Sequence, residues 1–132
     1  MHTERHPRSP FFLYLGILLI SAGGVMLEVA ITRIFSARIW YHYAFLAISI
    51  ALLGWGLGGL FLHILKQAGL VKSHIGTMVI LAIACAIGIP ASLWVIVRIP
   101  VATENLSIYF AVAVVPFLFA GMTLALALDH FK

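Results

Sequence analysis

The sequence predicts an all-α membrane protein with four transmembrane helices arranged as two hairpins. Of its 132 residues, 64% are hydrophobic and 9% are charged, a composition far outside the range of soluble globular proteins. The apolar residues fall into four runs of about 20 residues, the length that crosses a hydrocarbon core of ~30 Å. The net charge of +4 indicates topology and contact with lipid headgroups rather than nucleic-acid binding, because there is too little polar sequence for a basic face in water.

The first span is expected at residues 11–31, after a polar and basic arm at residues 1–10. Glu28 is the only charged residue in this span. No small-x-small cleavage pattern with a polar segment follows, so we expect an uncleaved membrane helix rather than a signal peptide. Helical spacing of apolar residues continues beyond Ile31, and the basic and aromatic residues of 32–43 are typical of headgroup depth. We therefore expect the helix to run on into the interface at a first outer turn.

Three further spans follow, at residues 44–65, 75–97 and 106–128. A short basic loop separates the second span from the third, a second outer loop separates the third from the fourth, and a polar tail follows. Pro90 and Pro116 lie inside the third and fourth spans, where each removes one backbone hydrogen bond. Broken helices of this kind can line a substrate site, and proline kinks also occur in membrane helices without one.

The distribution of Lys and Arg predicts the side on which each end of the chain lies. Five fall on the arm, the loop between the second and third spans, and the tail: Arg5, Arg8, Lys66, Lys72 and Lys132. Three fall on the opposite side: Arg33, Arg38 and Arg98. By the positive-inside rule both termini are expected in the cytoplasm. The predicted location is a bacterial inner membrane.

A glycine string in the second span, GWGLGG at residues 54–59, matches the letters of a dinucleotide-binding fingerprint. That fingerprint needs a preceding strand and an acidic residue about 20 positions later, and this region has neither. Packing is the better explanation, since close backbone approach drives helix association in lipid. Four small residues share one narrow helical face and are expected to receive another helix, from this chain or another subunit: Ala47, Ala51, Gly54 and Gly58.

Glu28 is the most conspicuous single residue, because a carboxylate at membrane depth is costly and usually has a partner or a role. We expect it in an intramembrane polar cluster with Thr32, Arg33, Ser49 and Tyr109. In one interpretation Arg33, Arg98 or hydroxyl donors hold the carboxylate and lock the bundle. The alternatives are a proton or cation site and a contact with lipid or another subunit.

His63 is the histidine that falls inside a span, and Gly59 precedes it by four residues. This spacing would let a tetrapyrrole such as haem or a chlorophyll-type pigment lie against the helix while the imidazole binds its metal. The alternative is a side chain that snorkels to the cytoplasmic boundary beside Lys66.

The sequence offers no catalytic or metal-binding constellation. Cys85 lies alone in an apolar run, which predicts a buried free thiol without a disulfide or a multi-cysteine metal site. The four acidic residues fall in separate places: Glu4, Glu28, Glu104 and Asp129. We therefore expect no enzyme activity in this chain.

One stretch, residues 27–59, resembles a known family. Glu28, Thr32 and Arg33, followed by YHYAFL at residues 41–46 and the glycine string, are similar to the N-terminal membrane region of spermidine-synthase-like integral membrane proteins. Those proteins fuse membrane helices to a soluble domain of the aminopropyltransferase fold. The resemblance implies a membrane module without that domain, to which no catalytic residue carries over. It admits a fragment of a longer fusion or a shortened, stand-alone subunit.

Together these observations predict a non-catalytic integral membrane module, or a small subunit, that assembles by helix packing. Its expected partners are membrane lipids and either other transmembrane subunits or further copies of itself, with no nucleic acid. One alternative is an accessory subunit of a photosynthetic or respiratory complex that contacts pigment or haem at His63. The other is a component of a small-molecule or polyamine transporter in which Glu28 titrates.

Overall fold

The structure, a computed structural model, describes residues 10–38, 43–71, 74–100 and 105–129. These residues form four helices: α1 (Pro10–Arg38), α2 (Tyr43–Gln67), α3 (His74–Arg98) and α4 (Leu106–Asp129). Each helix is long and apolar enough to cross a membrane, so the prediction of an all-α membrane protein with four spans is confirmed. Most of the predicted arm and tail, Lys72, and residues 39–42 of the first outer turn lie outside the described residues.

The first helix is longer than its predicted membrane span. It has 29 residues, or about 43 Å at 1.5 Å per residue, well beyond the ~30 Å of a hydrocarbon core. It continues through residues 32–38, which the sequence places at the first outer turn. Arg33 and Arg38 therefore lie on a helix, about one turn apart.

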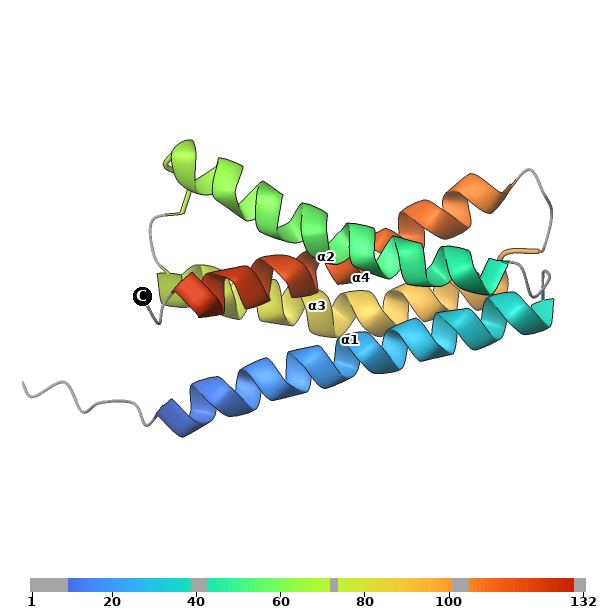
Figure 1. Ribbon diagram of the computed structural model, residues 1–132, viewed down its shortest axis with the longest axis horizontal. Coiled ribbons are helices and arrows are strands. Elements are labelled where there is room, and N and C mark those ends of the chain that lie inside the picture. Colours follow the sequence, from blue (N-terminus) through green and yellow to red (C-terminus); the bar gives the residue numbers. More distant parts are fainter. Residues whose placement is uncertain (1–9, 39–42, 72–73, 101–104, 130–132) are drawn as a thin grey trace, which may run out of the picture.

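The core of the bundle is built around α2 and α4, which cross in close contact while α3 covers α4 and α1 lies at one edge (Figure 1). Half of the α4 span is buried within the molecule, against 17% for α1. One apolar cluster joins all four helices, and its members include Leu27, Phe35, Ala47, Ala51, Ile96, Tyr109 and Phe117. A second cluster joins only the other three helices, through Leu62, Leu81, Met122 and Leu126.

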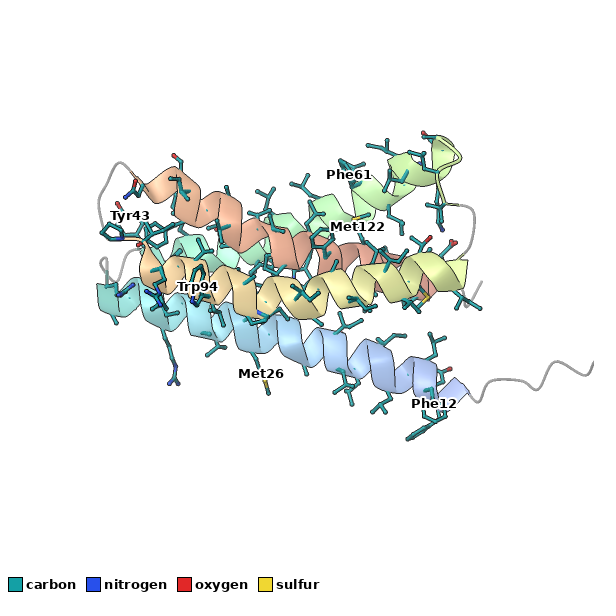
Figure 2. The ribbon with its side chains drawn as sticks, turned by 180° about the vertical axis from the view of Figure 1, so that it is seen from behind. Phe12, Met26, Tyr43, Phe61, Trp94 and Met122 are labelled. Carbon is teal, nitrogen blue, oxygen red and sulfur yellow. The ribbon has the colours of Figure 1, made fainter. Side chains whose placement is uncertain are left out.

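The two clusters reflect the position of α1, which packs against the bundle only along its C-terminal half. Gly24, Leu27, Ile31 and Phe35 are buried, whereas none of residues 11–20 is. The N-terminal half of α1 diverges from α3 (Figure 1), and Phe12 and Met26 point away from the bundle (Figure 2). This divergence leaves an apolar cleft of about 190 Å³, lined in part by Gly16, Ile17, Ile20, Met78, Ala82 and Thr123.

The end of α2 is set by Gly69. Its backbone has a φ of 70°, in the left-handed region where residues with a side chain are strained. Gly69 N donates to Lys66 O at 3.0 Å and Leu70 N donates to Leu65 O at 3.1 Å, the pair of bonds of a Schellman cap. The chain therefore leaves α2 with its last carbonyls satisfied and can reverse direction into α3.

Candidate functional site: a glycine-mediated helix contact and two charged ends

The small face of α2 lies against α4 of the same chain. Ala47, Ala51, Gly54 and Gly58 are all buried. A Cβ atom at Gly54 would lie 2.5 Å from the Phe117 Cβ, and one at Gly58 would lie 2.5 Å from the Leu118 carbonyl oxygen. Contacts this short leave no room for a methyl group. The backbones of the two helices therefore approach through positions that only glycine can occupy without displacing a helix.

The contact is reciprocal, because α4 presents its own glycine to α2. A Cβ at Gly121 would lie 2.6 Å from the Trp55 carbonyl oxygen and 3.0 Å from the Trp55 Cα. The Trp55 side chain is directed toward α1, where its Cζ2 would lie 2.7 Å from a Cβ at Gly24. Glycines of three helices thus allow α2 to contact α4 and α1 closely at the same level of the bundle.

The glycine string at residues 54–59 serves two different faces. A Cβ at Gly56 or Gly59 would have no neighbour within 4 Å, in contrast to Gly54 and Gly58. His63 lies seven residues after Gly56 on the same outward face and is exposed. Its Nε2 is 3.1 Å from the Gln67 Nε2, so the ring atom available to a tetrapyrrole metal already has a polar neighbour one turn away.

Among the described residues, no hydrogen bond joins the side chains of two members of the predicted polar cluster. Thr32 Oγ1 donates to the backbone carbonyl of Glu28 at 2.8 Å, not to its carboxylate. Ser49 is exposed, and its Oγ donates to the Phe45 carbonyl at 3.1 Å. Both hydroxyls find partners one turn back on their own helices, a local option that serine and threonine often take.

Tyr109 makes its hydrogen bond outside the predicted cluster. Its hydroxyl donates to the Ile99 carbonyl at 2.7 Å, which ties the start of α4 to the residue after α3. Its ring is buried and meets the Phe35 ring edge-on, with centroids 6.1 Å apart. Tyr109 therefore joins α1, α3 and α4. Of the two charged members of the predicted cluster, Glu28 is partly buried and Arg33 is exposed.

Each end of the bundle has its own charged contact. At one end Lys66 of α2 pairs with Asp129 of α4. At the other end Arg38 of α1 donates to two carbonyls near the end of α3, at 3.0 Å to Val97 and 3.4 Å to Ile96. Arg38 thereby satisfies carbonyls that the last turn of α3 leaves without helical partners. This contact was not predicted from the sequence. The one feature that could have indicated it is a basic residue, Arg38, in the last turn of α1.

The two prolines occupy different environments. Pro90 is exposed on α3, whereas Pro116 is buried in α4. A Cβ at Gly88 would lie 3.7 Å from the Pro116 Cβ, an ordinary packing distance. Cys85 is a buried free cysteine, as predicted, and its Sγ lies 3.8 Å from the Pro116 carbonyl oxygen. Pro116 is thus part of the α3–α4 contact and does not line an open site.

No group of three or more His, Cys, Asp or Glu side chains able to hold a metal ion occurs within the described ranges. The cleft beside α1 is lined almost entirely by apolar side chains, and the hydroxyl of Thr123 donates to the Phe119 carbonyl of its own helix. Comparisons of the chain with protein-family models, with curated proteins and with solved structures find no match.

Proposed function

We propose that this integral membrane protein is a non-catalytic module that assembles by helix packing. The observation that carries the proposal is the reciprocal glycine contact between α2 and α4. In lipid, close backbone approach is the main means of holding helices together. A chain that commits its inward glycines to this contact forms a defined bundle, whose outer surface is then free for assembly.

The outward surface supports the same proposal. A Cβ at Gly56 or Gly59 of α2 would meet no atom of the described residues within 4 Å, and the N-terminal half of α1 presents large exposed side chains such as Phe12 and Leu18. The hydroxyls of Thr32, Ser49 and Tyr109 are bonded to backbone carbonyls. These features favour a surface that packs against other membrane helices over a polar substrate path.

The resemblance of residues 27–59 to spermidine-synthase-like membrane proteins remains a prediction consistent with this role. On this resemblance, the module corresponds to the membrane segment of such fusions, in which catalytic activity belongs to a separate soluble domain. Both a homo-oligomer and a complex with other transmembrane subunits satisfy the proposal.

The experiment is recovery of complexes from the native membrane in mild detergent. Co-expressed copies with two different tags, and any transmembrane subunit, should be recovered with the chain. Gly56→Leu combined with Gly59→Leu should lose the complex and leave a folded monomer, because leucine at these positions blocks outward approach without touching α4.

The outcome that contradicts the proposal is a wild-type chain recovered from its membrane as a lone monomer. Gly54→Leu with Gly58→Leu is the matched comparison on the same helix. This second variant is expected to disrupt the bundle itself. If only this variant loses the complex, the face of Gly56 and Gly59 is not the site of assembly.

A further inference from the structure

The ends of α1 and α3 carry a concentration of positive charge. Arg33 and Arg38 lie in the last turns of α1, and Arg98 is the last residue of α3. We call this end of the bundle the arginine end. Among the residues that the structure describes, the acidic side chains are Glu28, deeper in α1, and Asp129, paired at the opposite end. The arginine end therefore has a charge that the described part of the chain does not neutralise.

Arg38 is held in place by backbone atoms. One terminal nitrogen, Nη1, makes both contacts to the Ile96 and Val97 carbonyls. A guanidinium has five N–H donors in a fixed fork, so Nη2 and Nε keep donors for another acceptor. Its contact with α3 fixes the orientation of that fork, which reduces the entropy lost when an anion binds.

Arg98 is positioned by an aromatic ring. Its guanidinium carbon lies 5.4 Å from the centre of the Trp94 ring, a cation–π arrangement. Stacking uses the face of the guanidinium and leaves its N–H edge available. Trp94 is 63% exposed and lies toward the same end of the bundle as Tyr43 (Figure 2), at the depth where tryptophan favours the membrane interface.

Two small residues follow Trp94 along the same row of α3. Pro90 and Ala86 continue the same row at intervals of four residues, and both are exposed. From Arg98 to Ala86 the row extends about 18 Å, at 1.5 Å per residue. This is close to half the thickness of a hydrocarbon core, about 15 Å. The row thus offers a path of small side chains that leads from a cationic end to the middle of the membrane.

We propose that the arginine end binds the phosphate of an anionic phospholipid. Arg98 and the free edge of Arg38 contact the phosphate oxygens, since guanidinium groups match this geometry with paired hydrogen bonds. Trp94 lies beside the glycerol region, and an acyl chain follows Pro90 and Ala86. Charge complementarity favours phosphatidylglycerol over zwitterionic phosphatidylcholine, whose choline carries a positive charge.

The test uses the full chain in phosphatidylcholine bilayers that contain a small fraction of brominated lipid, which quenches nearby tryptophan fluorescence. Brominated phosphatidylglycerol should quench the tryptophan fluorescence more than brominated phosphatidylcholine does. Trp94→Phe should remove this difference between the two lipids. Arg98→Gln and Arg38→Gln should each raise the half-saturating lipid fraction about tenfold, the effect expected when a charge-assisted hydrogen bond to the phosphate is lost. Arg98→Lys should recover part of the loss.

Arg33→Gln is the matched control, because it removes one charge at the same end from a side chain outside the Arg38–Val97 contact and the Trp94 stack. An equal loss in Arg33→Gln and Arg98→Gln would show a diffuse charge effect and overturn the site. Equal quenching by the two brominated lipids would also overturn it, as would displacement of phosphatidylglycerol by inorganic phosphate at the same concentration. A fivefold gain in Glu104→Gln would show that Arg98 already has an acidic partner, and would likewise contradict the proposal.

Discussion

At Gly58 the absence of a side chain is a structural requirement. A Cβ there would lie 2.5 Å from one backbone atom of α4 and 2.8 Å from another, the Met122 nitrogen. Backbone atoms within a helix cannot move aside as a flexible side chain can. At Gly56, half a turn away, the same atom would meet nothing. Two glycines of one string, separated by a single residue, therefore differ completely in what a substitution would cost.

Tyr109→Phe tests a polar contact at the residue scale. The variant keeps the ring against Phe35 but loses the hydroxyl that donates to Ile99. The free energy of unfolding should fall by about 1 kcal/mol, the usual net value of such a bond. Denaturant titration in mixed micelles measures it.

Tyr43→Phe is the control for this measurement, since the structure gives the Tyr43 hydroxyl no hydrogen-bond partner among the described residues. Its free energy of unfolding should change by less than about 0.5 kcal/mol. A larger loss for Tyr43→Phe than for Tyr109→Phe would rule out the proposed link between α3 and α4.

Among the elements, α4 determines the shape of the bundle. Its direction changes along its length between the halves drawn in orange and red (Figure 1), and Pro116 lies within it. A proline inside a helix removes one backbone bond and is a common cause of such a bend. Pro116 is buried and faces Gly88 of α3, so the bend occurs at a packed position of the bundle.

Pro116→Ala and Pro90→Ala form a matched pair at this scale. Pro116→Ala should lower the free energy of unfolding by about 1–2 kcal/mol, because it leaves a gap at a packed position. Pro90→Ala should be neutral or slightly stabilising, since Pro90 is exposed and alanine restores a backbone hydrogen bond. Comparison of denaturation midpoints is sufficient, and the reverse order would contradict the assigned role of Pro116.

Sequence periodicity predicted the helices and the small face of α2 but not the polar contacts. The spacing along one helix places Gly54 and Gly58 on the same side. Any helix that packs on that side buries them, so their burial could be predicted without knowing that the neighbour is α4. The depth argument behind the polar cluster fixed only the height of Ser49 and Tyr109 in the membrane. It could not fix the rotation of α2 or α4, nor the preference of each hydroxyl for a nearby carbonyl.

In the whole molecule, packing is uneven from one end to the other. All four helices meet toward the arginine end through the cluster around Phe35, while toward the Lys66–Asp129 pair only α2, α3 and α4 share a core. The divergence of α1 could not be read from its sequence, because its apolar residues surround the whole helix and do not indicate which half is packed. The α2–α4 pair is therefore the centre of the bundle, and α1 is the helix most open to contacts outside the chain.

The most direct measurement of the α2–α4 contact compares two double variants of α2 by unfolding in detergent, on samples first shown to be monomeric. Gly54→Leu with Gly58→Leu should lose the cooperative transition, because neither leucine fits against α4. Gly56→Leu with Gly59→Leu, which carries the same added volume on the outward face, should keep a transition close to wild type. If the first variant unfolds like wild type, or if both lose cooperativity equally, the α2–α4 contact does not hold this protein together.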